Sequence, residues 1–147
     1  LAVDRSEEAI ARARANAELN GFADRFEGVV GDARDVLKGL AGRTFGAVVL
    51  DPPAFAKSRK TAGNALRGYR ELNELGLALV ARGGFLFTSS CSYHVEDDRF
   101  LEVVAEAARA TRRHVRLVRR GEQAPDHPVV PWVAETRYLK SLALQVE

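Results

Sequence analysis

The sequence predicts an α/β sandwich, in which helices cover a mostly parallel sheet whose last strand runs antiparallel. Apolar runs typical of strands alternate with segments of helical periodicity along most of the 147 residues. Near the C-terminus the last two strands follow each other without a helix between them, which is the connection expected of an antiparallel pair. We therefore expect one sheet with helices packed against it.

The composition fits a single globular domain. Hydrophobic residues make up 46% of the chain and charged residues 29%, and both values exclude disordered, collagen-like and low-complexity proteins. No apolar run approaches the roughly 20 residues that span a bilayer, so no membrane association is expected. The single cysteine cannot form an internal disulfide, which predicts a reducing, cytoplasmic environment. The formal net charge of +2 is too small to indicate a nucleic-acid partner by itself.

The N-terminal part of the chain predicts two strand–helix pairs. The short apolar run 1–3 ends at Asp4 and precedes a segment of helical spacing that extends to Gly21. A second strand is expected over 26–30, and Asp32 then suits the N-cap of a short helix.

The rest of the chain predicts the larger part of the sheet. The run 45–50 is continuously apolar, which is typical of a central strand buried on both faces, and two prolines end it. The further expected elements are a helix over 69–80 that ends at Gly83-Gly84, a strand at 85–87, a helix over 95–110, and strands at 115–118 and 138–146.

Polar side chains follow four of the predicted strands, and ligands of open parallel sheets bind beyond the carboxyl ends of the strands. These four residues are Asp4, Asp32, Asp51 and Cys91. Asp4 can accept the hydroxyls of a nucleoside ribose, and Asp32 can contact an adenine amino group, helped by backbone donors around Ala33. The alternative is that both aspartates are helix-entry carboxylates without a ligand.

The two remaining strand ends carry more reactive chemistry. Asp51 is followed by Pro52 and Pro53, a stiff turn that can hold a carboxylate and carbonyl groups against a flat heterocycle, with Phe55 stacked on the ring or packed beneath it. Cys91 stands between two serines at the next strand end, where a thiolate nucleophile is plausible. The alternatives are a plain turn and a small buried apolar residue.

A basic segment with an interleaved tyrosine follows the Asp51 turn and suits unpaired RNA, because phosphates bind cations and bases stack on aromatic rings. The alternative is a solvated loop. The histidines have no metal-ligand spacing, so no metal site is expected. The residues of the segment are Lys57, Arg59, Lys60, Arg67 and Tyr69.

The stretch VLDPPAF at 49–55 and the stretch TSSCS at 88–92 together resemble the class I S-adenosylmethionine-dependent methyltransferases. The closer resemblance is to the RlmI-type enzymes, bacterial methyltransferases that form 5-methylcytosine in large-subunit ribosomal RNA. The Asp-Pro-Pro turn alone is shared by many methyltransferases of amino groups, whereas its pairing with Ser-Cys-Ser is much more specific. The resemblance covers essentially the whole chain and includes RGY at 67–69, GG at 83–84, DHPV at 126–129 and YLK at 138–140.

The resemblance implies a Rossmann-like sandwich, an S-adenosylmethionine cofactor and a ribosomal RNA partner. The thiolate of Cys91 would add to carbon 6 of a flipped-out cytosine, and Asp51 would stabilise charge at ring nitrogen 3. The cofactor would contact Asp4, Arg5, Asp32, Ala33, Asp51 and Pro52. The RNA would contact Pro53, Phe55, Lys57, Arg59, Lys60, Arg67 and Tyr69.

Two other functions stay open. An exocyclic-amino methyltransferase acting on guanine or adenine would use the Asp-Pro-Pro turn and keep Cys91 as a structural residue. A non-catalytic module would fold, as a homodimer for example, and bind RNA or a partner without the cofactor.

The chain departs from the family at its beginning. Residues 1–147 contain neither the strand and Gly-rich turn that precede Asp4 in the family nor its N-terminal RNA-binding domain, and the sequence contains no methionine. We therefore expect a partial catalytic domain that lacks the first strand of its sheet, whose place is between the strands that end at Asp4 and at Asp51.

Overall fold

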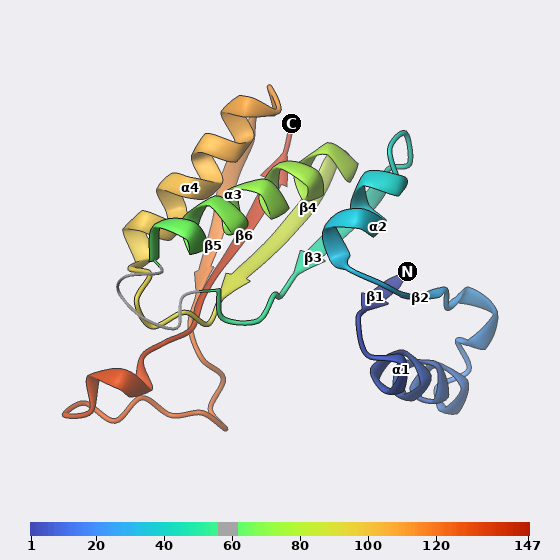
Figure 1. The fold of residues 1–147 in the computed structure, drawn as a ribbon, viewed down its shortest axis with the longest axis horizontal. Coiled ribbons are helices and arrows are strands. Elements are labelled where there is room, and N and C mark those ends of the chain that lie inside the picture. Colours follow the sequence, from blue (N-terminus) through green and yellow to red (C-terminus); the bar gives the residue numbers. More distant parts are fainter. Residues whose placement is uncertain (56–61) are drawn as a thin grey trace. The chain divides into compact units, whose positions relative to one another are not determined.

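The computed structural model describes residues 1–55 and 62–147, which form two compact units (Figure 1). The first unit comprises Leu1–Ala41 and the second Gly42–Glu147. None of the helices in the described residues is both long and apolar enough to cross a membrane.

The first unit is built on two parallel strands, in which Ala2 pairs with Gly28 and Asp4 with Val30. Helix α1 begins after Ser6, whose hydroxyl accepts a hydrogen bond from the backbone of Ala9. A Cβ on Gly28 would come within 2.7 Å of the Ile10 side chain, so glycine lets this helix pack closely on the sheet. The elements are β1 (Ala2–Asp4), α1 (Glu7–Leu19), a 3₁₀ turn (Ala23–Arg25), β2 (Gly28–Val30) and α2 (Ala33–Gly39).

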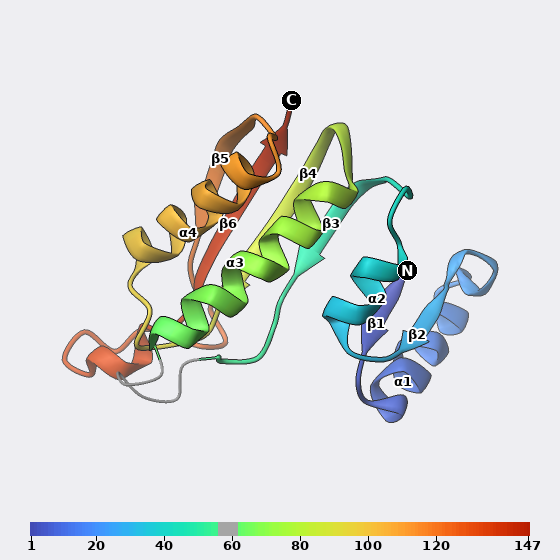
Figure 2. The ribbon, with the colours of Figure 1, turned by 45° about the horizontal axis from the view of Figure 1, so that its top comes forward.

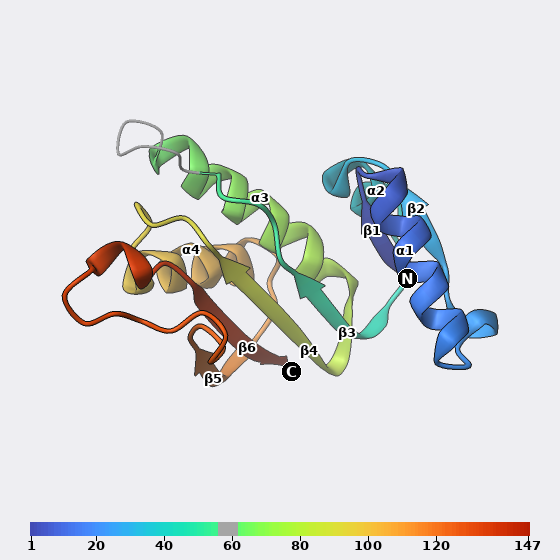
Figure 3. The same cartoon turned by 90° about the horizontal axis from the view of Figure 1, so that it is seen from below.

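The second unit is a four-stranded sheet in the order β3-β4-β6-β5, with α3 and α4 on the same face (Figures 2 and 3). The two helices pack against each other and bring apolar side chains onto that face of the sheet. The elements are β3 (Phe45–Leu50), α3 (Ala62–Leu79), β4 (Val80–Ser90), α4 (Asp97–Ala110), β5 (Val115–Gly121), a 3₁₀ turn (Ala134–Thr136) and β6 (Lys140–Val146).

The predicted α/β architecture is confirmed, but the prediction of a mostly parallel sheet is wrong. Strand β3 pairs parallel with β4, whereas β6 pairs antiparallel with both β4 and β5. The last strand is antiparallel, as expected. It lies inside the sheet, however, so two of the three pairings in this unit are antiparallel and the sheet is mixed.

Strand β3 also differs from its prediction as a strand buried on both faces. Leu50 is buried, but Val49 is 70% exposed. In the part of the chain that the structure describes, α3 and α4 lie on one face of the sheet, and β3 pairs only with β4 within its unit (Figure 3). Leu50 is on this covered face, because a Cβ on Gly76 of α3 would be 2.8 Å from its side chain. The continuous apolar run 45–50 therefore forms a strand with one face covered by helices and one face exposed.

The junction between α3 and β4 lies earlier than the sequence predicts. Helix α3 ends at Leu79, and β4 runs from Val80 through both glycines that we expected to separate the two elements. Gly83 adopts a φ of 80°, which favours glycine. Gly84 lies against β3, because a Cβ there would be 2.7 Å from the carbonyl oxygen of Gly46.

We expect Gly84→Ala to destabilise the fold, because the added methyl group has backbone oxygen atoms as neighbours and these cannot move aside cheaply. The free energy of unfolding should fall by about 1–3 kcal/mol, measured by urea denaturation. The matched control is Gly63→Ala in the exposed first turn of α3, where a Cβ meets nothing within 4 Å. The control should be neutral or stabilise the chain by up to about 1 kcal/mol, and an equal loss in both variants would contradict the argument.

Candidate active site

Two polar turns meet at the carboxyl ends of β3 and β4. Asp51 follows β3 and Cys91 follows β4, and the two strands are parallel neighbours. The hydroxyl of Ser89 donates a hydrogen bond to Oδ1 of Asp51 at 2.5 Å. The Sγ atom of Cys91 lies 3.9 Å from the carbonyl oxygen of Pro52. The structure therefore brings Asp51, Pro52 and Cys91 to one edge of the sheet.

The thiol of Cys91 is half-buried and stands beside polar groups. Both neighbours in the chain are buried serines, and the Ser90 hydroxyl accepts a hydrogen bond from the backbone N–H of Ser92 at 3.3 Å. The carboxylate of Asp51 is exposed. An acid and a thiol are thus accessible on adjacent turns.

The turn after Cys91 is anchored from two other elements. The phenol oxygen of Tyr69 in α3 is 2.9 Å from Oγ of Ser92. The ammonium group of Lys140, at the start of β6, donates a hydrogen bond to the carbonyl oxygen of Ser92 at 2.7 Å. Burial lowers the pKa of Lys140, and the charges of Asp97 and Cys91 oppose this shift.

The expected contact between Tyr69 and an RNA base is wrong. Tyr69 is fully buried, its ring packs 4.7 Å from the ring of Phe55 and 5.4 Å from that of Phe100, and its hydroxyl is paired with Ser92. Tyr69 lies on the buried face of α3. The sequence suggests that its ring stacks on an RNA base, but in the structure its hydroxyl instead anchors the turn that follows Cys91.

The other residues expected to bind RNA lie in the same region of the chain. Pro53 and Arg67 are exposed, and Arg67 donates a hydrogen bond to Asn64 at 2.5 Å. Phe55 is half-buried. The predictions for Lys57, Arg59 and Lys60 lie outside the described residues.

In the first unit, Asp4 is the last residue of β1 and Asp32 follows β2, and these two strands are parallel neighbours. Oδ1 of Asp4 accepts a hydrogen bond from the backbone of Ser6 at 2.7 Å, and Oδ1 of Asp32 caps α2 through Arg34 at 3.0 Å. Oδ2 of Asp32 is 3.9 Å from Nε of Arg5. Both carboxylates therefore act as helix-entry groups, yet Asp4 is exposed and Asp32 partly so.

This arrangement fits an adenosine-containing ligand in its donor and acceptor chemistry. Carboxylates accept hydrogen bonds from ribose hydroxyls and from an adenine amino group. The backbone of Ala33, the exposed first residue of α2, lies directly after Asp32. The residues that the sequence assigned to the nucleoside thus stand together in the first unit.

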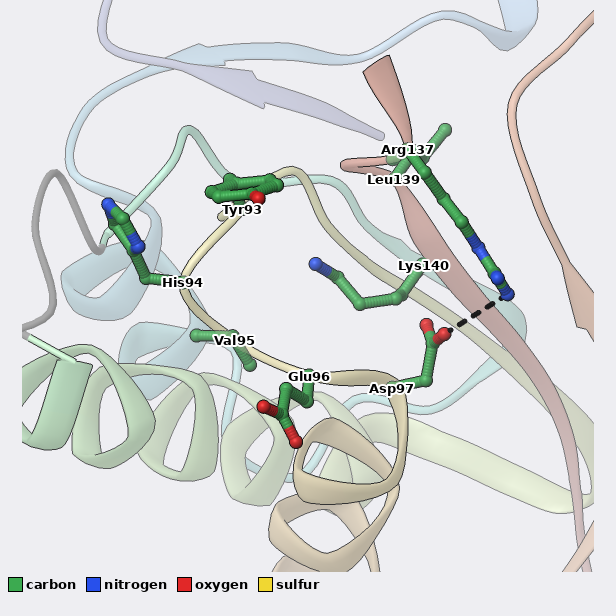
Figure 4. A pocket seen from close by; sticks show the side chains of 8 residues that line it. All are labelled: Tyr93, His94, Val95, Glu96, Asp97, Arg137, Leu139 and Lys140. Carbon is green, nitrogen blue, oxygen red and sulfur yellow. Dashed lines mark ion pairs between the residues drawn. The ribbon is translucent and has the colours of Figure 1, made fainter. Parts of the chain in front are cut away.

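A cavity of about 580 Å³ opens next to the Cys91 turn (Figure 4). Its walls carry both charge signs, and the Arg137 guanidinium lies 3.5 Å from the Asp97 carboxylate across one side. The ammonium end of Lys140 points into the space between these groups and Tyr93. The lining residues are Tyr93, His94, Val95, Glu96, Asp97, Arg137, Leu139 and Lys140.

Sequence reasoning missed two residues of this site, Ser89 and Lys140. Strand alternation could have indicated Ser89, because it lies two residues after Phe87 on the open face of β4. Lys140 belongs to the YLK stretch that carries part of the resemblance, but a lone lysine at the start of a strand gives no signal that it is buried.

Comparisons with known proteins relate the chain to ribosomal RNA methyltransferases. Ribosomal RNA large subunit methyltransferase I of Shewanella denitrificans is 41% identical over 149 residues, which cover 98% of this chain and 37% of that protein. A candidate ribosomal RNA large subunit methyltransferase of Methanocaldococcus jannaschii is 39% identical over 150 residues, which cover all of this chain and 38% of that protein. No family model matches the chain.

A solved structure supports the fold assignment. The crystal structure of a candidate methyltransferase complexed with SAH matches 98% of this chain and 38% of its own, with a TM-score of 0.76 at 20% identity. The chain spans well under half the length of each of these proteins. It is therefore related to the S-adenosylmethionine-dependent methyltransferases of the RlmI type and corresponds to about 37% of their length.

Proposed function

We propose that this chain carries the catalytic residues for methylation of carbon 5 of a cytosine in large-subunit ribosomal RNA. One observation carries the proposal: an accessible thiol, on Cys91, stands beside the Asp51-Pro52 turn at the carboxyl ends of two neighbouring parallel strands. Both sequence relatives are named as methyltransferases of large-subunit ribosomal RNA, which supports the choice of substrate.

S-adenosylmethionine is the proposed methyl donor, and when bound it supplies an electrophilic methyl group. Asp4 would accept hydrogen bonds from its ribose hydroxyls, and Arg5, whose Nε is 3.9 Å from Oδ2 of Asp32, would contact the cofactor as well. Asp32 and the backbone of Ala33 would contact the adenine. The partly exposed carboxylates of the first unit support these roles.

The proposed role of Cys91 is to activate carbon 5 of the cytosine ring for methylation. Carbon 5 of cytosine is a poor nucleophile because it belongs to a conjugated ring. When the thiolate adds to carbon 6, a carbon–sulfur bond forms, and the electron pair of the former double bond spreads over carbon 5 and ring nitrogen 3. After carbon 5 has taken the methyl group, it loses its proton to a base, the double bond re-forms, and the sulfur leaves carbon 6.

Asp51 would neutralise the negative charge that develops on the ring. A proton shared between its carboxyl group and ring nitrogen 3 stabilises the adduct while carbon 6 is bonded to sulfur. The Ser89 hydroxyl donates a hydrogen bond to Oδ1 of Asp51, which restricts rotation of the carboxyl group. The target cytosine must leave its base stack to reach both groups, which favours a looped or flipped nucleotide.

A second candidate is methylation of an exocyclic amino group of guanine or adenine in RNA. The Asp51 carboxylate and the Pro52 carbonyl are adjacent hydrogen-bond acceptors, and such a pair suits an amine. Cys91 would then be structural. Mass spectrometry of the modified nucleoside distinguishes the two candidates, because one yields 5-methylcytidine and the other an N-methylated purine.

We expect Cys91→Ala to abolish methylation in the protein at its natural length. The loss should be about a thousandfold or more in rate, because the activating addition to carbon 6 cannot occur. The measurement is transfer of radiolabelled methyl groups to large-subunit ribosomal RNA, with cofactor binding measured by calorimetry on the same sample. Turnover at the natural rate in the alanine variant would refute the covalent route. Absence of cofactor binding in the natural protein would favour a module that only binds RNA or a partner.

We expect Ser89→Ala to lower kcat by about tenfold, because Asp51 loses the hydroxyl that orients it. The matched control is Ser141→Ala. Ser141 is the cross-strand partner of Ser89 on β6 and is half-buried like it, so the control removes a hydroxyl of the same face. An equal fall in kcat in both variants would show that Ser89 acts only through the packing of the sheet.

We expect Asp4→Asn to weaken binding of S-adenosylmethionine by about tenfold, because an amide accepts hydrogen bonds from ribose hydroxyls less strongly than a carboxylate. Calorimetric titration measures the dissociation constant. Asp24→Asn is the control, since Asp24 is another exposed aspartate of the first unit, in the 3₁₀ turn away from the strand ends. Unchanged affinity in the Asp4 variant would contradict the proposed nucleoside site.

A further inference from the structure

Lys140 is a buried cation at the edge of the candidate active site. It is the first residue of β6 and only 7% exposed. Its Cα partner across the antiparallel ladder is Ser90, and its ammonium group reaches the carbonyl oxygen of Ser92 at 2.7 Å. The side chain therefore spans the two residues that flank Cys91.

Charged and ionisable side chains from several parts of the chain surround this ammonium group. Asp97 stands at the start of α4, Cys91 follows β4, and Arg137 lies across the cavity, paired with Asp97 at 3.5 Å. Burial lowers the pKa of Lys140, and the charges of Asp97 and Cys91 oppose this shift. Of these neighbours only Cys91 belongs to the proposed reaction.

A purely structural role explains this lysine poorly. The carbonyl oxygen of Ser92 already accepts a hydrogen bond from the backbone N–H of Val95 at 3.0 Å, so this oxygen has a partner even without Lys140. Burying an ammonium group costs free energy that an apolar side chain at the same position would not cost. Its charge, rather than its hydrogen bond alone, is therefore what distinguishes it from an apolar residue.

We propose that Lys140 is a positioning residue for Cys91: its ammonium group fixes the turn 90–92 and places a positive charge beside the thiolate. A nearby cation favours the thiolate, which is the form that adds to carbon 6. This inference rests on the proposed function of Cys91 as a nucleophile. It assigns to the start of β6 a role that neither of the flanking serines can fill, because they are uncharged.

The test measures the reactivity of Cys91 without RNA or cofactor, in the protein at its natural length. The rate of alkylation by iodoacetamide at pH 7 is followed by mass spectrometry of the peptide that contains Cys91. Lys140→Gln keeps a hydrogen-bond donor and removes the charge, and Lys140→Met removes both, so either variant that folds carries the test. Lys140→Arg keeps the charge.

The matched control is Arg113→Met. Arg113 is also a partly buried cation that donates to a backbone carbonyl of β4, that of Val80 at 2.5 Å, but at the opposite end of the strand. We expect the neutral Lys140 variants to slow alkylation by about fivefold, Lys140→Arg to retain most of the rate, and Arg113→Met to leave it unchanged.

The possible results separate this inference from the proposed function. Alkylation at the natural rate in a folded Lys140→Gln or Lys140→Met variant, or an equal slowing in Arg113→Met, would overturn the role of Lys140. Slowed alkylation in the neutral Lys140 variants, together with a natural protein that forms no 5-methylcytidine, would leave the effect of Lys140 on the Cys91 thiol standing and refute the proposed function. If both hold, Lys140→Gln should lower kcat for methyl transfer while KM for RNA stays nearly constant.

Discussion

The parallel pairing of β3 with β4 is the constraint on which the candidate active site depends. Parallel neighbours end at the same edge of a sheet, so the turns that follow them start side by side. This pairing alone brings Asp51 next to Ser89 and Pro52 next to Cys91, although about 39 residues separate the partners in the chain.

Much of this arrangement was predictable because strand ends leave strong local signals. The apolar run 45–50 stops directly before Asp51, whereas the run 85–87 stops four residues before Cys91 and places the end of β4 only approximately. The α/β order indicates that the two strands are parallel. The position of β6 was not predictable in the same way. Its alternating pattern specifies a strand with one covered face, and says nothing of whether it joins the sheet at the edge or between two other strands.

Side-chain burial was the other property that the sequence predicted poorly. Tyr69 sits in a basic, RNA-like context, but helical phase turns its ring towards the sheet, where Phe55 and Phe100 enclose it. Val49 shows the opposite error, since an apolar residue in a continuous run is largely exposed. In both cases the neighbours that decide burial come from distant parts of the chain, and local composition does not encode them.

The insertion of β6 beside β4 has a consequence for the site as well as for the sheet. An antiparallel strand begins where its neighbour ends, so the first residue of β6 lies level with the last residue of β4. Lys140 can therefore reach over Ser90 to the carbonyl of Ser92, while Tyr69 reaches the hydroxyl of Ser92 from α3. Two buried anchors from different elements thus hold the residue after Cys91, and the thiol itself stays partly exposed. A nucleophilic cysteine needs both an anchored backbone and an exposed sulfur, because the backbone must hold the sulfur in place while the sulfur remains accessible to the substrate.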